Sequence, residues 1–354
     1  MTIQQPDTMI FSEIIGQGQA WREMIPIVLD QKAAIQKIFK DIEEVLFIGC
    51  GSGLNASFTA SVLFQMSTQK GACTVPAAEI IYFPKGVFRT DRKTGAVLMS
   101  RSGKTSEIVQ ALSILRKCHI PTIGITCHEH SPLADASDFS LVLTPVLEQA
   151  VPTTRSVTGM IIVAQLIAAI VSGTHYEINR IKQLPDLCEN LIDECKEQAQ
   201  QIGNRADIKR FAFVGNGPYY GLARESQLKI KEMTLQPSDG YPLFDFRHGP
   251  QSTVDENMLI TVLISDSARE QEIQFIRDMK SLGAVIWVIC DKSDNTIRQT
   301  ADYVVELKSN LNEISRLPLY LPAVQLLAFY HAQSLGLNPD VPHNLSYWID
   351  LSRK

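Results

Sequence analysis

Residues 97–108 read VLMSRSGKTSEI and residues 262–273 read VLISDSAREQEI, an ungapped match that recurs 165 residues further along the chain. In each copy an apolar run of the kind that forms a buried parallel strand leads into a small polar turn and then into a helical pattern. Another strand-like run follows each copy and ends in cysteine, TIGITC at Cys127 and VIWVIC at Cys290. The repeat therefore predicts a duplicated α/β unit.

A second pair of segments supports the duplication. EVLFIGCGSG (44–53) and FAFVGNGPYYG (211–221) are both apolar runs that lead into Gly-x-Gly and then a helical pattern. Strands that alternate with helices imply right-handed crossovers and parallel sheets covered by helices on both faces. We expect a flavodoxin-like three-layer α/β/α fold in each unit.

The predicted boundaries follow from this repeat. We expect an N-terminal helical segment over 1–39, a first domain over 40–195, a second domain over 196–336, and a tail over 337–354 that contributes to the active site. The pattern also predicts one long helix over 20–40 and a charged linking helix over 186–205.

Composition limits the class of protein. The chain has 354 residues and a net charge of −5, and this mild acidity argues against a nucleic-acid partner. Its longest apolar run, MIIVAQLIAAIV (160–171), is shorter than a bilayer span, so we expect a buried helix and no membrane partner. Seven cysteines without a Cys-x-x-Cys pair, and a start without a secretion-signal pattern, lead us to expect reduced thiols and a cytoplasmic location.

The turn SRSGKTSE is the first candidate site. It follows a predicted strand and opens a helix, where free backbone N–H groups and the helix dipole attract an oxyanion. Hydroxyls of Ser100, Ser102 and Thr105 would donate to that anion, and Gly103 would let the backbone close on it.

The alternative for this turn is N-capping, because a serine followed by Glu107 is common at helix starts. The repeat favours the anion site. In the second copy Ala268 replaces the glycine and Glu270 replaces the threonine, which adds negative charge where an anion would lie. We therefore expect the first copy to bind phosphate and the second to keep only the scaffold.

A helix and a turn in the second half offer acid–base groups. RESQLKIKEM places Glu225, Lys229 and Glu232 on one helix face, which fits either a solvated ion-pair ladder or a catalytic base. In DFRHGP, Gly249 and Pro250 would hold the His248 imidazole in a tight turn, for a structural hydrogen bond or for catalysis.

Taken together, SRSGKTSE, GCGSGLN and ARESQLKIKEMTLQPSDGYPLFDFRHGP resemble the sugar isomerase (SIS) domain family in its tandem form. The similarity extends over nearly the whole chain. It is strongest to the isomerase half of glucosamine-6-phosphate synthase and to stand-alone amino-sugar phosphate deaminases, deglycases and ketose/aldose isomerases.

The resemblance implies roles for particular residues. It implies that Glu232 is the base that moves a proton between C1 and C2, and that His248 opens the sugar ring from the neighbouring subunit of a homodimer. The implied substrate-binding residues are Ser52, Ser100, Arg101, Ser102, Gly103, Thr105, Thr153, Lys229, His343 and Tyr347. Among these, Ser100, Ser102 and Thr105 would bind the 6-phosphate, helped by Ser52.

The chain also departs from the family pattern. Gly53 stands where the family often has a second hydroxyl, and Tyr347 stands where the synthase-like tail has a lysine that forms an imine with an open-chain ketose. We therefore expect no imine from this position. No cysteine follows Met1, so we do not expect synthesis of an amino sugar from glutamine.

These observations lead us to expect a phosphosugar aldose–ketose isomerase or deaminase. The leading reaction converts glucosamine 6-phosphate to fructose 6-phosphate and ammonia. The alternatives are a fructosamine-6-phosphate deglycase and a non-catalytic phosphosugar sensor. We expect no cofactor and no metal, since His128 and His130 lack an acidic or cysteine partner at ligand spacing.

Overall fold

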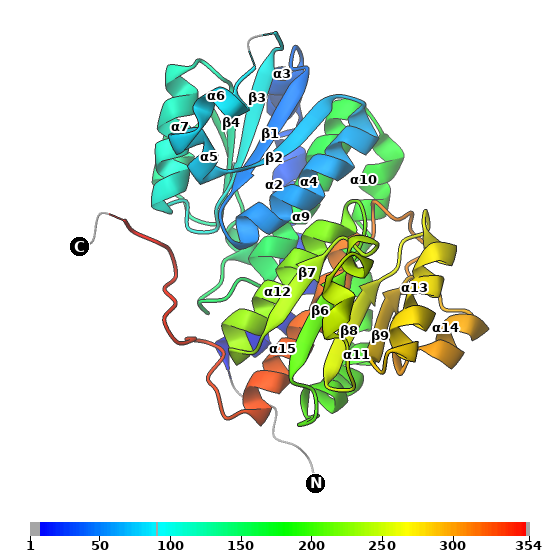
Figure 1. Cartoon of the computed structure of the whole chain (residues 1–354). Coiled ribbons are helices and arrows are strands. Elements are labelled where there is room, and N and C mark those ends of the chain that lie inside the picture. The colour runs from blue at the N-terminus through cyan, green and yellow to red at the C-terminus, as the bar shows by residue number, and fades with distance from the viewer. Residues whose placement is uncertain (1–7, 90, 352–354) are drawn as a thin grey trace.

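The computed structural model describes residues 8–89 and 91–351 and contains two five-stranded parallel sheets, both flanked by helices (Figure 1). The predicted fold class, two tandem α/β domains, is confirmed. The seven cysteines all lie in the described part of the chain and are free thiols.

The first domain is built around the strands β1 (Glu44–Gly49), β2 (Gly71–Pro76), β3 (Thr94–Met99), β4 (Thr122–Thr126) and β5 (Phe139–Val142). They pair in the order β2-β1-β3-β4-β5. Its helices are α4 (Ser52–Thr68), α5 (Ala77–Tyr82), α6 (Pro84–Val87), α7 (Ser106–Lys117), α8 (Pro132–Ala136), α9 (Arg155–Ser172) and α10 (His175–Ile181), with a short 3₁₀ turn η1 (Thr144–Val146).

The second domain repeats this plan with β6 (Arg210–Val214), β7 (Ser238–Tyr241), β8 (Met258–Leu263), β9 (Val285–Cys290) and β10 (Tyr303–Glu306). The strand order is β7-β6-β8-β9-β10, the doubly wound order of the first sheet again. Its helices are α12 (Tyr219–Thr234), α13 (Arg269–Ser281), α14 (Asn295–Thr300) and α15 (Leu321–Ser334), with 3₁₀ turns η2 (Asp245–Arg247), η3 (Pro250–Thr253) and η4 (Leu317–Tyr320).

Strand residues alternate between two cores, because successive side chains of a strand point to opposite faces. In β1, Val45 and Phe47 belong to the large core that contains α4 and α9, whereas Leu46 and Ile48 belong to a smaller core under α5 and α7. Both faces are therefore buried, which explains the continuous apolar runs in the sequence.

Helix α9 is the central helix of the molecule. Its composition and length would allow it to cross a membrane, but 83% of the helix is buried inside the protein. It packs against α4, α2 and η4. The expectation of a buried helix over 160–171 is confirmed, and the observed helix is longer than this range at both ends. The large core thus joins both domains.

The N-terminal segment differs from the prediction of one long helix. It forms α1 (Met9–Ile15), α2 (Gln17–Asp30) and α3 (Lys32–Phe39), with a break at Gln31, where φ is −93° and ψ is 9°. After the break, Ile35 and Phe39 of α3 pack into the large core. Tertiary packing has overridden the helical pattern here.

The linking helix is α11 (Leu184–Gly203), close to the predicted 186–205. The predicted domain boundary between 195 and 196 falls inside this helix. Residues 1–7 of the predicted N-terminal segment and residues 352–354 of the predicted tail lie outside the described residues.

The topology brings the candidate motifs together. Strands β1 and β3 are neighbours and pair Gly49 with Met99 at their carboxyl ends, so the turns that follow them emerge side by side. Helix α12 lies between the two domains and packs against α4, and the tail returns from α15 to the first domain (Figure 1). Ligands of open α/β sheets bind at this kind of edge.

Candidate active site

The loop between β3 and α7 forms a turn of hydroxyl groups, which we call the first cradle (residues 100–105). Ser100 and Ser102 are buried, with 6% and 3% of their surface exposed. The Gly103 N–H donates to the carbonyl and the hydroxyl oxygens of Ser100, both at 3.2 Å, and the Lys104 N–H donates to Ser102 Oγ at 3.1 Å. Ser100 Oγ also lies 3.4 Å from Thr105 Oγ1, so the loop holds its own hydroxyls in place.

Helix capping does not account for these hydroxyls. Thr105 is the N-cap residue of α7, and within the described residues its side chain makes no capping hydrogen bond. The cradle therefore presents three hydroxyls at a helix N-terminus beside the carboxyl edge of the sheet, an arrangement that suits an oxyanion.

A cavity of about 200 Å³ lies next to the first cradle. Eight of the predicted site residues line it: Ser52, Ser100, Arg101, Ser102, Thr105, Thr153, Glu232 and Tyr347. They come from the turn after β1, the first cradle, the start of α9, the end of α12, and the tail. The structure thus gathers residues that lie as far apart as 52 and 347 in the sequence.

Lys229 lies behind this cavity. We call this lysine and the four side chains that its ammonium group contacts the hub. The lysine side chain is fully buried, and Nζ lies 3.1 Å from Glu225 Oε1 and 2.5 Å from Glu232 Oε2. It also donates to Ser52 Oγ at 3.3 Å and to Thr153 Oγ1 at 3.2 Å. One ammonium group therefore fixes two carboxylates and two hydroxyls that come from both domains.

The helix face Glu225–Lys229–Glu232 is not a solvated ladder. Glu225 is 1% exposed and accepts hydrogen bonds from Ser52 Oγ and Asn55 Nδ2, both at 3.0 Å. Glu232 keeps 18% of its side chain exposed, at the cavity wall. Of the two carboxylates, Glu232 is the one that a ligand in the cavity can reach.

Burial controls the electrostatics of the hub. It raises the pKa of Glu225 above its ordinary value, although the Lys229 ammonium acts in the opposite direction. Burial alone would lower the pKa of Lys229, but the two carboxylates outweigh it, and the net pKa of Lys229 is raised. Lys229 therefore stays a cation at neutral pH.

The tail covers one side of the cavity. The Ser106 N–H at the start of α7 donates to the Ile349 carbonyl at 3.2 Å, and the Leu351 N–H donates to Ser106 Oγ at 3.0 Å. Figure 1 shows the tail (red) running from α15 up to the first domain. Tyr347 donates its hydroxyl to the Glu148 carbonyl at 2.7 Å, which anchors the tail beside Thr153.

Arg101 holds this tail in place. Its guanidinium carbon lies 3.7 Å from the centroid of the Tyr347 ring and stacks on it. Its nitrogens donate to the carbonyls of Ala150, Val151 and Tyr347 at 2.8 to 3.1 Å, with Glu148 at 3.5 Å. Although Arg101 lines the cavity, its hydrogen-bond donors are thus bonded to protein groups. Its role is to position the tail.

The predicted site residue Gly103 and the nearby Gly53 have packing roles. Gly103 has φ of +62°, and a Cβ there would lie 2.2 Å from Ser131 Oγ, so this glycine permits a close approach of residues behind the cradle. A Cβ on Gly53 would lie 2.4 Å from the Met99 carbonyl oxygen, which leaves no room for the hydroxyl residue common in the family.

Two predicted site residues lie elsewhere in the chain. His248 is exposed in the turn between η2 and η3, and His343 is exposed in the tail; neither lines the cavity. The structure thus does not bring His248 to Glu232 within one chain. Its predicted role from a neighbouring subunit stays a prediction.

Several lining residues were not predicted as site residues. Trp348 follows Tyr347 along the cavity, and Cys50 and Met160 contribute apolar surface. Burial raises the pKa of the Cys50 thiol to about 12, so it is not a thiolate nucleophile at neutral pH. The position of Glu225 beside Lys229 follows from the helix face expected from the sequence, whereas the Glu148 contact with Arg101 has no local sequence signal.

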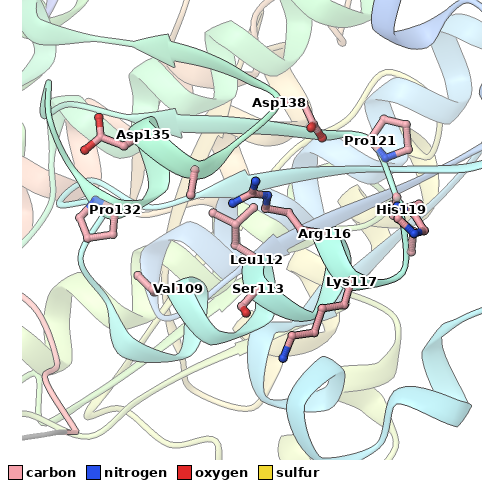
Figure 2. Close-up of a pocket in the computed structure, with 12 residues that line it drawn as sticks. Val109, Leu112, Ser113, Arg116, Lys117, His119, Pro121, Pro132, Asp135 and Asp138 are labelled. Atoms are coloured by element: carbon pink, nitrogen blue, oxygen red, sulfur yellow. The ribbon is translucent and has the colours of Figure 1, made fainter.

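A larger cavity of about 980 Å³ lies on the outer side of the first domain (Figure 2). Side chains of α7, the 119–121 segment and α8 line it, including Arg116, Lys117 and Asp135. It contains no residue of the first cradle or of α12. Over residues 8–89 and 91–351, no group of three or more His, Cys, Asp or Glu side chains is arranged to hold a metal ion.

Comparison with known proteins agrees with the fold. The SIS domain matches residues 38–170 and 206–330. Glutamine–fructose-6-phosphate aminotransferase (isomerizing) of Sulfurisphaera tokodaii is 25% identical over 346 residues, which cover 96% of this chain and 56% of that protein. The enzyme of the same name from Caldanaerobacter subterraneus is 27% identical over 331 residues, 90% of this chain and 54% of that protein. The chain thus spans about half the length of these relatives.

Solved structures match over nearly their whole length. Tagatose-6-phosphate ketose/aldose isomerase from Escherichia coli superposes with a TM-score of 0.87 at 20% identity, covering 97% of this chain and 98% of that one. Glucosamine-6-phosphate deaminase from Thermotoga maritima superposes with a TM-score of 0.72 at 27% identity, covering 92% of this chain and 99% of that one. With the SIS domain matched twice, once over each sheet, the chain belongs to the SIS domain family.

Proposed function

We propose that the chain is a phosphosugar aldose–ketose isomerase that acts on an amino-sugar 6-phosphate and releases ammonia. The leading reaction converts glucosamine 6-phosphate and water to fructose 6-phosphate and ammonia. The similarity to a glucosamine-6-phosphate deaminase and to ketose/aldose isomerases supports this class of reaction.

The first cradle supports the phosphate half of the proposal. Ser100, Ser102 and Thr105 present hydroxyls at the N-terminus of α7, where backbone N–H groups and the helix dipole favour a dianion. A 6-phosphate bound there would place the sugar ring towards the other wall of the cavity.

The position of Glu232 is the observation that carries the chemical half. Its carboxylate lines the same cavity as Ser102 and Thr105, and Lys229 holds its Oε2 at 2.5 Å. A fixed carboxylate at this wall can remove the proton from C2 of an open-chain aldose and return it to C1. With an amino group on C2, this transfer gives a C2 imine, and water then adds at C2 and displaces ammonia.

Tyr347 supports direct hydrolysis of that imine. Its ring stacks on Arg101 and its hydroxyl donates to the Glu148 carbonyl. Because a tyrosine has no amine, this position cannot form a second imine with the sugar.

We also propose that the enzyme is a cytoplasmic homodimer in which His248 of one subunit completes the site of the other. The exposure of His248 in its turn supports this arrangement, because such a side chain is free to reach a partner. Ring opening requires an acid–base group near the ring oxygen, and His248 of the neighbouring subunit would supply it.

A panel of phosphosugars tests the proposed function. The purified chain is incubated with glucosamine 6-phosphate, with a fructosamine 6-phosphate adduct and with tagatose 6-phosphate, and ammonia, free amine and ketose or aldose products are measured. We expect ammonia and fructose 6-phosphate from the first compound, lost in Glu232→Gln. Release of free amine from the adduct alone would instead identify a deglycase, and binding without turnover of any compound would identify a sensor.

A further inference from the structure

The second domain contains a copy of the cradle, which we call the second cradle (residues 265–270) and which comprises part of the loop after β8 and the first two residues of α13. Ser265 and Ser267 occupy the positions of Ser100 and Ser102 in the repeat. Ser265 is buried, and α13 begins at Arg269, two repeat positions earlier than α7, which begins at Ser106. The second cradle thus keeps the two serines of the first cradle beside the start of a helix.

A carboxylate from elsewhere in the chain occupies this second cradle. Glu313 Oε2 accepts hydrogen bonds from the N–H groups of Asp266 at 2.8 Å and Ser267 at 3.4 Å. Its Oε1 accepts from the Ser267 hydroxyl at 2.5 Å. Two backbone N–H groups and one hydroxyl of the loop before α13 converge on one carboxylate, which is how such a loop would bind an oxyanion.

A second carboxylate binds the inner half of the loop. Glu272 accepts from the Ser265 N–H at 2.8 Å and the Ser265 hydroxyl at 3.0 Å, and Asn216 in the turn after β6 donates to it at 3.3 Å. Its counterpart in the repeat is Glu107, whose Oε2 is buried and has no hydrogen-bond partner within the described residues. The two cradles therefore differ in what their donors bind.

The segment that carries Glu313 also joins the two domains. Gln165 of α9 donates to the carbonyls of Ile314 at 2.6 Å and Ser315 at 3.0 Å. Glu177 of α10 accepts from Asn312 Nδ2 at 2.9 Å and from Ser315 Oγ at 2.5 Å. Residues on both sides of Glu313 are thus bound to helices of the first domain.

An ion pair fixes the same segment to the second cradle. Arg316 donates to both carboxylate oxygens of Asp266, at 2.9 and 2.6 Å, and its side chain is 2% exposed. Asp266 occupies the position of Arg101, so the charge at this place in the loop is reversed between the domains.

We propose that the second cradle is an oxyanion site retained from the repeat, and that its ligand is the chain's own Glu313 carboxylate. Binding of this carboxylate holds segment 311–316 in place between the two domains. A site of this kind takes a small carboxylate anion. When Glu313 is removed, free acetate can occupy the vacated donors.

Chemical rescue of Glu313→Ala tests the proposal through thermal unfolding of the full chain, a readout that does not depend on the enzyme's reaction. We expect the variant to lose about 3 to 6 °C in Tm. Saturating acetate should restore at least about half of that loss, and neutral acetamide, which offers one uncharged acceptor oxygen, should restore clearly less than acetate does. The wild type, measured in the same series, corrects for any general effect of acetate.

Three further variants serve as controls. Glu194→Ala breaks an exposed ion pair with Lys308 at 2.6 Å outside the cradle and should show no acetate rescue. Adding Ser267→Ala to Glu313→Ala removes a donor and should weaken the rescue several-fold. If Glu313→Ala does not fold, Glu313→Gln is measured instead; it should lose less Tm and show no acetate rescue, because its amide oxygen still occupies the donors. A Tm unchanged in either variant, or rescue of Glu313→Ala by acetate no larger than in the wild type, would overturn the proposal.

Discussion

Lys229 Nζ lies 2.5 Å from Glu232 Oε2, and the lysine is fully buried while the glutamate keeps 18% of its side chain exposed at the cavity. The ammonium therefore fixes the carboxylate from behind and leaves it accessible from the front. Contacts of the same ammonium with Ser52 and Thr153 tie this carboxylate to the first domain. The relative position of the two domains thus decides where the proposed base sits.

Loss of the buried cation should destabilise the fold. Lys229→Met leaves the Glu225 carboxyl, 1% exposed, without its counter-charge, and we expect a loss of about 3 to 5 kcal/mol in the free energy of unfolding, measured with urea. Adding Glu225→Gln should recover part of this loss. The control Lys196→Met breaks an exposed pair with Asp193 and should cost less than about 1 kcal/mol. Equal losses for the buried and the exposed lysine would contradict this account of the hub.

The first cradle should be needed for binding rather than for folding. Ser102→Ala combined with Thr105→Ala removes two hydroxyl donors to a dianion, so phosphosugar binding should weaken by roughly 2 to 5 kcal/mol in calorimetry, with an unchanged circular dichroism spectrum. The matched change in the second cradle, Ser265→Ala with Ser267→Ala, should leave phosphosugar affinity within about twofold. Unchanged affinity in the first pair would show that the cradle does not bind the phosphate.

Glu13 should make stability depend on pH near neutrality. Burial raises the pKa of Glu13 from 4.5 to about 7. The folded state keeps this proton to a higher pH than the unfolded chain does, so the stabilisation is complete below pH 4.5 and is lost as the pH rises through 7. Glu13→Gln lacks this titration, and its stability should rise relative to wild type by roughly 3 kcal/mol over that interval. Urea unfolding at several pH values measures the difference; a constant difference would refute the assignment.

Mixed dimers should show whether His248 acts across the subunit interface. His248→Ala and Glu232→Gln homodimers should each be inactive, because every site lacks one group. After subunit exchange, about half of the dimers are mixed, and each has one intact site, so activity should return to roughly a quarter of wild type. Differently tagged subunits confirm the exchange. Exchange without recovery would place His248 in its own chain's site or outside the reaction.

The duplicated fold could be predicted because its signals are local. The segment 97–108 is repeated without a gap at 262–273, and an apolar run precedes each turn. This pattern was sufficient to predict two parallel sheets. The N-terminal helices could not be predicted as well. The break at Gln31 depends on where Ile35 and Phe39 must pack, which is a property of the assembled core.

The candidate site divides in the same way. Ser102, Thr105 and Glu232 lie in motifs whose spacing indicates chemistry, and the structure places them around one cavity. The contacts of Arg101 with residues 148–151 and with Tyr347 join segments that are distant in the sequence, so no local pattern could show them. The occupation of the second cradle by Glu313 is of the same kind: the sequence indicated added negative charge at Glu270, whereas the carboxylate bound there comes from 43 residues further on.

Kinetics and binding of Glu232→Gln test the central claim most directly. Gln keeps the shape of the side chain and can still meet Lys229, but it cannot accept the proton, so kcat on the substrate found in the panel should fall by about 10²-fold or more while the dissociation constant of the phosphosugar changes by less than about threefold. Asp239→Asn, which alters only an exposed pair with Lys231, provides the control and should keep wild-type kinetics. A Glu232→Gln enzyme with near-normal kcat would contradict the account and would leave Glu232 as a structural partner of Lys229.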